Sequence, residues 1–308
     1  MIDLSSLIEP SKAAGGIYIL FIVFEMIYAS RKGSVRYEAK DTVTSIIMGV
    51  GSTVVAGIVG GALYLIAMWV WQNYSITDLG SPLWVFIVAF IAYDFVYYWL
   101  HRFGHTMRWM WAAHVIHHSS QHYNLSTALR QTWTSFLTPG FIFSLPMVVL
   151  GIHPMIIIFV TGLNLIYQFW FHTEAIDKMP PWFEAIMNTP SHHRVHHATN
   201  PKYLDRNHAG VFIIWDKMFG TFEPEDEEKP IYGLINNVGT FNPLKIASHE
   251  WVSIFKDWIK ADSWSDRVKY LVMAPGWSPD GSRKTSKMLR QEWEKEQYQK
   301  NIEAKAAE

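Results

Sequence analysis

Histidine is the residue type whose number and spacing most clearly suggest chemistry in this sequence. Thirteen of the 14 histidines lie between residues 101 and 208, and eight of these form three short motifs. The motifs are HxxxH at 101–105, HxxHH at 114–118 and HxxHH at 193–197. Residues three and four apart share one face of a helix, so each motif should direct its imidazoles toward one point. Imidazole is the commonest metal ligand in proteins, and the pattern predicts a metal site.

The absence of cysteine narrows the kind of site. With 0 Cys, the chain has no disulfide framework, thiolate zinc site, iron–sulfur cluster or cysteine nucleophile. Eight directed imidazoles are too many for one ion, and two ions of octahedral or trigonal-bipyramidal type fit better than a closed tetrahedral zinc site. Any single motif could be a set of surface histidines without metal. Three motifs in order favour the metal site.

The distribution of charge predicts which elements carry these motifs. Charged residues are only 17% of the chain and aromatic residues are 15%, against about 25% charged in ordinary soluble domains. Residues 41–100 contain three charged side chains, residues 131–173 contain none, and 38 of the 53 charges follow residue 173. The sequence thus predicts a membrane half followed by a polar half. A net charge of −1 gives no basic field for nucleic acid.

Four apolar regions are candidate membrane segments, since a helix needs about 20 apolar residues to cross. They are residues 15–30, 46–71 and 82–100, and a helical hairpin, re-entrant or spanning, over 136–171. The expected fold is all-α: an integral membrane helical bundle of four to five segments with a cytoplasmic helical cap. Expected domains are 1–100 (N-terminal spans), 101–222 (histidine-rich, including the hairpin) and 223–308 (C-terminal helices and polar tail). The alternative is a soluble protein with buried apolar helices.

The short loops predict the orientation of these segments. Arg31, Lys32, Arg36 and Lys40 follow the first segment, whereas residues 72–81 contain no Lys or Arg. Positive loops stay in the cytoplasm. We therefore expect a multi-pass membrane protein with its N-terminus outside and with the histidine motifs and the C-terminus in the cytoplasm. The acidic first residues lack the basic region of a cleaved signal peptide.

The sequence resembles the fatty acid hydroxylase superfamily, also called the sterol desaturase family, of membrane di-iron oxygenases. The order HxxxH, HxxHH, HxxHH is that family's signature. Further similar segments are HVIHHSSQHYNLSTALR (114–130), YQFWFHTE (167–174), NTPSHHRVHH (188–197) and AGVFIIWDKMFGTF (209–222). Within the family, the chain looks most like the members that oxidise alkylglycerol lipids.

This resemblance implies a set of metal ligands and a reaction. The ligands carried over are His101, His105, His114, His117, His118, His172, His193, His196 and His197. They would hold two iron ions, with zinc as a possible substitute after purification. The partners implied are O2, a membrane lipid and an electron donor, either a tetrahydropterin or a redox protein. The implied reaction hydroxylates the carbon beside the ether oxygen of an alkylglycerol lipid. The membrane would be the inner membrane of a bacterium or the endoplasmic reticulum of a eukaryote.

Residues around the ligands can also be proposed, because a ligating imidazole usually donates its other N–H to a carboxylate or carbonyl. Asp94 lies two helical turns before His101, and a carboxylate within a span is a functional candidate. Weaker candidates are Asn124 and Glu174. His192 could be either a tenth ligand or a hydrogen-bonding partner of a ligand. We expect His122 and His208 to lie outside the ligand set. Asp216 could orient a helix or belong to a turn.

Two other functions remain open from the sequence. A related oxygenase could hydroxylate or desaturate a sterol, a carotenoid or the acyl chain of an aminolipid. A histidine-rich metal transporter would place its ligands and paired carboxylates within the spans, whereas here the motifs lie at span ends. The stretch 243–261 has helical apolar spacing with lysines beside it, which indicates a helix on the membrane face or one packed on the polar half.

Overall fold

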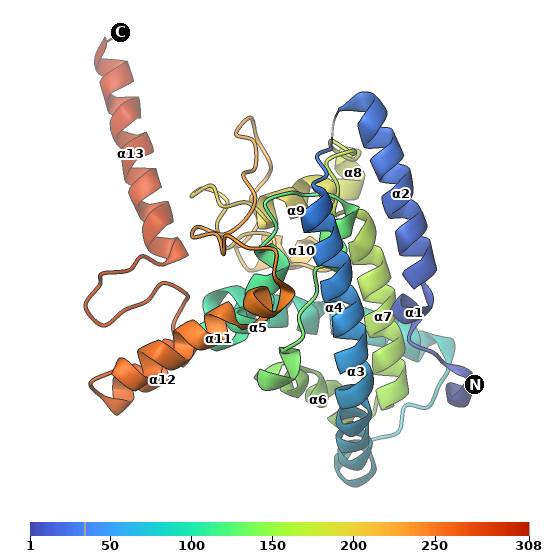
Figure 1. The fold of residues 1–308 in the computed structure, drawn as a ribbon. Coiled ribbons are helices and arrows are strands. Elements are labelled where there is room, and N and C mark those ends of the chain that lie inside the picture. The colour runs from blue at the N-terminus through green and yellow to red at the C-terminus, as the bar shows by residue number, and fades with distance from the viewer. Residues whose placement is uncertain (34, 308) are drawn as a thin grey trace.

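The protein is described by a computed structural model covering residues 1–33 and 35–307, and the secondary structure in this part is helical (Figure 1). Its α-helices are α1 (Pro10–Ala13), α2 (Gly15–Lys32), α3 (Ala39–Tyr74), α4 (Leu83–Thr106), α5 (Arg108–His118), α6 (Leu145–Val149), α7 (Pro154–Trp170), α8 (Pro181–Glu184), α9 (Pro190–His196), α10 (Ile214–Met218), α11 (Pro243–Lys260), α12 (Trp264–Val272) and α13 (Ser286–Ala307). Four 3₁₀ segments span Leu4–Ser6, Leu125–Leu129, Ser135–Leu137 and Pro139–Ser144. The described residues contain no β-strand, only two isolated bridges.

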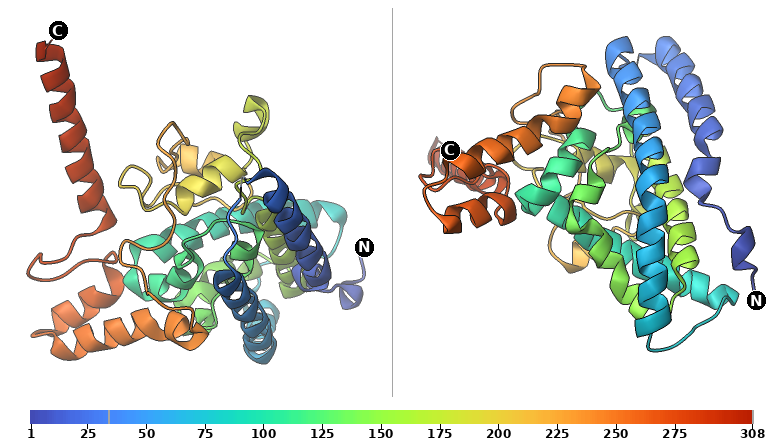
Figure 2. Two further views of the ribbon diagram at one scale, coloured as in Figure 1. Left: turned by 45° about the horizontal axis from the view of Figure 1, so that its top comes forward. Right: turned by 60° about the horizontal axis from the view of Figure 1, so that its bottom comes forward.

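Three helices are long and apolar enough to cross a membrane, and they confirm the first three segments expected from the sequence. They are α2 with its preceding turn, α3 and α4. Helix α3 has 36 residues and is about 54 Å long, well beyond a ~30 Å hydrocarbon core. Only 6% of its apolar window is buried, so most of its surface is free for lipid. The right-hand view of Figure 2 shows α2 and α3 as two long rods at one side of the molecule.

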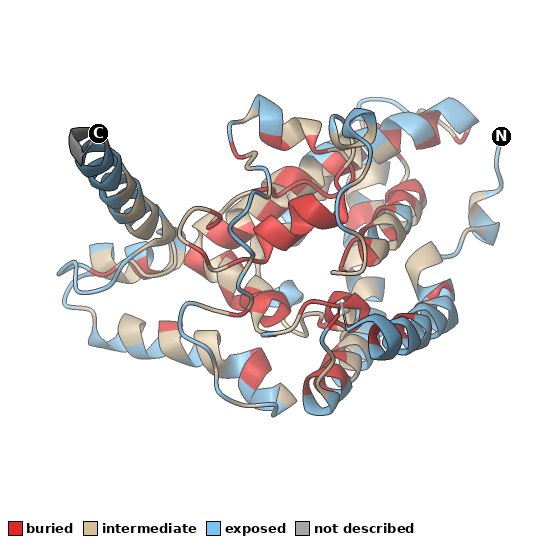
Figure 3. Ribbon diagram, turned by 90° about the horizontal axis from the view of Figure 1, so that it is seen from above, coloured by how far each residue is buried: buried red, intermediate tan, exposed pale blue. Residues whose placement is uncertain are grey.

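The packed interior lies between α4 and the later helices. Val85, Phe86 and Ala89 of α4 form a buried cluster with Ile156 and Val160 of α7. Figure 3 shows buried residues concentrated at the centre and exposed residues on the outer helices. Helix α4 continues six residues past the expected end of its span, so the first histidine motif lies on the last turns of a helix anchored in this interior.

The region 136–171 forms a hairpin with unequal limbs. The first limb runs through the 3₁₀ segment Pro139–Ser144 into the five-residue α6, and the second is the 17-residue α7. Between them, Gly151 has φ 98°, and a Cβ there would lie 2.2 Å from the Thr77 carbonyl oxygen, so this turn requires glycine. Ile76 N donates to Val149 O at 2.8 Å, which places the hairpin tip beside the α3–α4 loop. The expected four to five segments are therefore three long helices and this shorter hairpin.

The chain termini lie at different parts of the molecule. Ile2 N donates to Ser81 O at 2.9 Å, so the N-terminus adjoins the α3–α4 loop. The histidine motifs lie at the other end of α4, because His101 and His105 are on its last turns. Helices α11 and α12 extend from the side of the molecule, and α13 stands away from the remaining helices in Figure 1 and in the left-hand view of Figure 2.

Candidate metal centre

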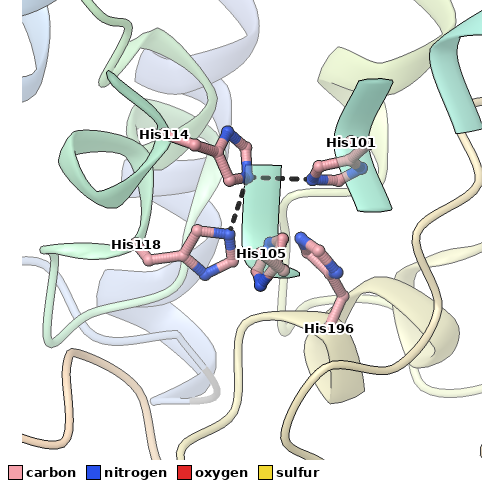
Figure 4. Close-up of side chains that lie close together, drawn as sticks. All are labelled: His101, His105, His114, His118 and His196. Carbon is pink, nitrogen blue, oxygen red and sulfur yellow. Dashed lines mark hydrogen bonds between the residues drawn. The ribbon is translucent and has the colours of Figure 1, made fainter. Parts of the chain in front are cut away.

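Five histidines from three helices form the first imidazole group. Helices α4 and α5 contribute two each and α9 contributes one: His101, His105, His114, His118 and His196. Figure 4 shows their rings turned toward one another. One nitrogen of each ring lies within 4.8 Å of the others. Nε2 of His114 lies 2.9 Å from Nε2 of His101 and 3.1 Å from Nε2 of His118. These residues are the five-histidine group.

Four further histidines form a second group: His117, His172, His193 and His197. His172 follows the end of α7, so this group includes a residue directly after the hairpin. Nε2 of His172 lies 3.2 Å from that of His117 and 3.1 Å from that of His193, which is 3.1 Å from that of His197. These residues are the four-histidine group. The rings of His118 and His197 stack with centroids 4.4 Å apart, so the two groups are neighbours.

The expectation that each HxxHH motif directs three imidazoles to one point was wrong. His114 and His118 join the five-histidine group, while His117 joins the four-histidine group. Successive residues project about 100° apart on a helix, so the adjacent histidines of a motif diverge. The motif at 193–197 divides in the same way, because His196 joins the five-histidine group. Each HxxHH motif therefore serves both groups and links them.

The geometry of both groups fits metal coordination. Two nitrogen ligands about 2.1 Å from one ion lie about 3.0 Å apart at a right angle and about 3.4 Å apart at a tetrahedral angle. The Nε2 separations are 2.9 to 3.2 Å. In addition, the buried Nε2 atoms of His105 and His196 have no hydrogen-bond partner among the described residues. Such unpartnered buried atoms are costly unless a ligand occupies the space between them.

Main-chain carbonyl groups orient four of the imidazoles. In each case an Nδ1 atom lies within hydrogen-bonding distance of a main-chain carbonyl oxygen. The pairs are His101 with the carbonyl of His208 (2.7 Å), His117 with that of Arg130 (3.2 Å), His172 with that of Gln168 (2.8 Å) and His196 with that of Arg206 (3.0 Å). Because a carbonyl can only accept, these contacts assign the proton to Nδ1 and leave the Nε2 lone pair for a metal. His105 Nδ1 instead lies 3.5 Å from an Asp205 carboxylate oxygen.

Asp94 contacts this system differently from the sequence expectation, which had its carboxylate receiving an imidazole N–H. Asp94 is fully buried. It accepts from the backbone N–H groups of Val211 (2.7 Å) and Phe212 (3.0 Å), and from the side chains of Trp215 (2.9 Å) and Asn164 (2.7 Å). These four donors occupy the carboxylate. Asp94 therefore holds the segment after His208 against α4 and α7.

Asp216 holds the same segment from its other side. Its carboxylate accepts from His208 N at 2.8 Å, Ala209 N at 2.7 Å and Thr221 Oγ1 at 2.6 Å. Burial raises the pKa of Asp216 to about 6, although these hydrogen bonds act in the opposite direction. Asp94 and Asp216 together fix the backbone that presents the His208 carbonyl to His101. The sequence suggested Asp216 only as a helix-orienting or turn residue.

Two other candidates lie close to the site without contacting an imidazole through a recorded hydrogen bond. Asn124 caps the 3₁₀ turn at 125–129, accepting from Ser126 N and donating to Arg36 O at 2.9 Å. Glu174 accepts from Tyr232 at 3.2 Å, and the Tyr232 ring stacks on Tyr123. Burial raises the pKa of Glu174. Both residues therefore act on neighbouring segments.

Five histidines lie outside the groups, and three of these, His122, His192 and His208, occupy separate places. His122 lies 3.2 Å from a Glu38 carboxylate oxygen and is partly exposed. His192 is buried and lines a polar pocket of about 310 Å³ that also includes Lys178 and Lys217. His208 is buried, and its carbonyl oxygen accepts a hydrogen bond from His101 Nδ1. The expectation that His122 and His208 lie outside the ligand groups agrees with this geometry.

The buried imidazoles outside the spans are neutral at pH 7. Burial, reinforced by neighbouring histidines, lowers the pKa well below 6.5 for His114, His118, His193, His196 and His197. Burial also lowers the pKa of His117 to about 4. A neutral imidazole is the form that binds metal, so these rings need not lose a proton first.

One contact near the site was missed by the sequence reasoning. The carbonyl oxygen of Arg130 accepts a hydrogen bond from His117 Nδ1. Arg130 is 1% exposed, and its guanidinium lies 3.0 Å from an Asp41 carboxylate oxygen. Asp41 also accepts from Ser120 at 2.7 Å. This ion pair joins the start of α3 to the segment after α5. The isolated charge of Asp41 at the head of an apolar run was the available signal.

Comparisons with known proteins agree with this centre. A family model described as fatty acid hydroxylase matches residues 86–221, which contain every residue of both groups. An alkylglycerol monooxygenase of Homo sapiens is 40% identical over 88% of this chain and 61% of its own length. One from Caenorhabditis elegans is 40% identical over 79% of this chain and 50% of its own length.

A more distant relative is a cholesterol 25-hydroxylase-like protein of Danio rerio, 27% identical over 51% of this chain and 64% of its own length. The chain spans between 48% and 61% of the length of the alkylglycerol monooxygenases it matches. No solved structure shows a significant match. The chain therefore carries a fatty acid hydroxylase domain over residues 86–221, and over most of its length it is similar to alkylglycerol monooxygenases.

Proposed function

We propose that this protein is a membrane di-iron monooxygenase that hydroxylates a C–H bond of a lipid. The observation that carries the proposal is the pair of imidazole groups at the end of an apolar helix, α4. The five-histidine group would hold one iron and the four-histidine group the other. Bound iron would supply the activation of O2 that insertion into an unactivated C–H bond requires.

The substrate we propose is an alkylglycerol lipid, on the basis of 40% identity to alkylglycerol monooxygenases. The carbon beside the ether oxygen gains one oxygen atom of O2. The other oxygen atom leaves as water with two electrons and two protons from the reductant. The resulting hemiacetal breaks its C–O bond to give an aldehyde and a glycerol derivative. A tetrahydropterin or a redox protein is the proposed source of the two electrons.

The chain's own residues would perform three tasks in this reaction. Burial of both imidazole groups excludes bulk water from the reacting region. The carbonyl partners would hold His101, His117, His172 and His196 each in one tautomer and one orientation. The exposed apolar surfaces of α2, α3 and α4 support a position in the membrane, where a lipid chain could approach without crossing water.

We also propose the topology and the division of the chain. The N-terminus would lie outside, and the imidazole groups and the C-terminus in the cytoplasm, because Arg31, Lys32, Arg36 and Lys40 follow α2. Residues 1–100 would anchor the chain, 101–222 would carry out catalysis, and 223–308 would form the cytoplasmic end. Reporter fusions at residues 76 and 308 should then lie on opposite sides of the membrane.

Lipid profiling tests the proposed reaction. Cells expressing the protein should consume alkylglycerols and accumulate the aldehyde, whereas cells expressing His193→Ala should not. The matched control is His122→Ala, which lies outside both groups and should retain activity. Consumption of a sterol would instead favour the activity named in the more distant relative. If no lipid is consumed in an oxygen-dependent way, the proposal is contradicted.

A further inference from the structure

Helix α11 carries an exposed apolar stripe that the proposed chemistry does not use. Leu244, Val252, Phe255 and Ile259 are between 46% and 68% exposed. At about 100° per residue they lie within roughly 80° of one another around the helix axis. The opposite side packs inward: Ile246 is buried with Met48 of α3 and Ile116 of α5. The stripe is therefore a separate face of a helix that is already anchored.

The charges of α11 are sorted between these faces. Both acidic residues pair inward: Arg108 donates to Glu250 and to Asp257 at 2.7 Å each, and Arg283 also donates to Asp257. The three lysines, Lys245, Lys256 and Lys260, are exposed, and none has an ion pair among the described residues. They fall about 100° to 160° from Leu244, directly beside the apolar stripe. The outer surface is thus apolar and cationic.

Helix α12 continues the same pattern. Trp264, Val268 and Val272 are exposed at four-residue intervals, which places them on one face. The Arg267 guanidinium lies 4.8 Å from the centre of the Trp264 ring and 5.1 Å from that of Trp258. Tryptophan and arginine together are typical of the boundary between acyl chains and headgroups. The two helices therefore present two apolar faces with cations beside them.

The position of α11 is continuous with the lipid-facing surface of α3. Thr44 Oγ1 of α3 donates to Phe241 O, just before α11, at 3.0 Å. Val43, Ile47 and Val50, on the same stretch of α3, are exposed. The beginning of α11 therefore lies at the level where α3 starts to expose apolar side chains. Figure 1 shows α11 and α12 leaving the bundle sideways rather than along α3.

We infer that α11 and α12 lie in the interfacial layer of the bilayer leaflet beside the imidazole groups, with their lysines against anionic phospholipid headgroups. Basic amphipathic helices bury their apolar face about 5–10 Å into this layer. Because Arg108 ties α11 to α5, which carries the second histidine motif, this contact sets the depth of the metal centre relative to the lipid. The inference rests on membrane insertion of α3 and not on the proposed reaction.

The test uses single-cysteine variants, which are practical because the chain has no cysteine. Phe255→Cys and Ile259→Cys, each labelled with an environment-sensitive NBD fluorophore, report on the stripe. Ile58→Cys on α3 is the lipid-exposed control, and Glu296→Cys on α13 is the aqueous control. The full chain is reconstituted in phosphatidylcholine vesicles with and without phosphatidylglycerol. Quenching by nitroxide lipids and by aqueous iodide is then measured.

We expect labels at 255 and 259 to be quenched by nitroxide lipid nearly as strongly as the label at 58, and several-fold less by iodide than the label at 296. Phosphatidylglycerol should increase the lipid quenching, and the combined substitution Lys245→Gln, Lys256→Gln and Lys260→Gln should remove that increase. Iodide quenching equal to that at 296 would overturn the inference. Protection from both quenchers would overturn it in favour of a covering protein. Lipid quenching that does not change with phosphatidylglycerol would overturn the assignment of anionic phospholipid as the partner.

Discussion

The five-histidine and four-histidine groups lie side by side but are supported by different parts of the chain. Two rings of the five-histidine group, His101 and His196, contact carbonyls in one loop, residues 206–208. In the four-histidine group, His117 contacts the carbonyl of Arg130, before the hairpin, and His172 contacts that of Gln168, in the second limb of the hairpin. The first group therefore depends on the polar half of the molecule, and the second depends on the hairpin.

The groups also differ in their number of ligands. An ion that prefers six positions would keep one free position in the five-histidine group and two in the four-histidine group. Loss of one imidazole leaves four ligands in the first case and only three in the second. We therefore expect the four-histidine group to be the less tolerant of substitution.

The largest expected effect compares His172→Ala with His105→Ala. His172→Ala should reduce the metal content from about two ions per chain to about one and reduce activity by more than the ~100-fold that loss of an outer partner can cause. His105→Ala should retain more metal, because four imidazoles remain. Metal analysis and lipid turnover measure both, with His122→Ala as the unaffected control. Equal metal loss in the two variants would remove the distinction between the groups.

The next effect concerns Asp94, which contacts the loop after His208 through Val211 and helix α7 through Asn164. Asp94→Asn keeps the size but removes the charge, so we expect a folded protein with activity reduced by ~10–100-fold. Asp94→Leu should insert more readily, because an ionised side chain at the helix centre costs ~2.5–3.5 kcal/mol on insertion scales, yet lose more metal. Normal metal content and turnover in both variants would show that Asp94 only helps helices to pack.

A smaller effect is expected at Asp216, which supports only the five-histidine group. Asp216→Asn retains one acceptor for two backbone N–H groups, and a buried unsatisfied group costs about 1–3 kcal/mol. We expect partial metal loss from the five-histidine group alone, seen as one weakened ion in a competition with chelator. Asp262→Asn, at an exposed residue outside both groups, is the matched control. Weakening of both ions would contradict separate support.

The last prediction concerns how the stability of the protein depends on pH through Asp216. Because burial raises its pKa from 3.8 to about 6, the native state favours the protonated form. The stabilising contribution is complete below pH 3.8 and is lost as the pH rises through about 6, with a total of roughly 3 kcal/mol. The melting temperature of the natural chain minus that of Asp216→Asn should therefore decrease as the pH rises from 3.8 to about 6. Above about pH 6 this difference should stay constant. A difference that rises with pH would contradict the assignment.

Much of this arrangement follows from sequence. Helical spacing and the absence of cysteine pointed to eight histidines, the family resemblance added His172, and the structure gathers these nine into two neighbouring groups. The charge-free runs predicted the long helices, because a span is recognisable from length and composition alone. The division of each HxxHH motif was also available from the 100° step between His117 and His118, although we expected convergence.

The supports of the rings could not be predicted from sequence. Every residue has a carbonyl, so nothing marks those of His208, Arg206, Arg130 and Gln168 before the loops are placed. The partners of Asp94 also lie far away in sequence, around Val211. Its charge indicated a buried role, but only the fold shows that it holds a loop and not a ring.

Metal analysis of freshly purified protein, combined with X-ray absorption spectroscopy, tests the central claim most directly. The account predicts about two ions per chain, each bound by four or five imidazole nitrogens and no sulfur. Zinc in place of iron would be compatible, because nitrogen sites bind zinc more strongly than iron(II). A content near zero or one, or a first coordination shell dominated by oxygen, would contradict it.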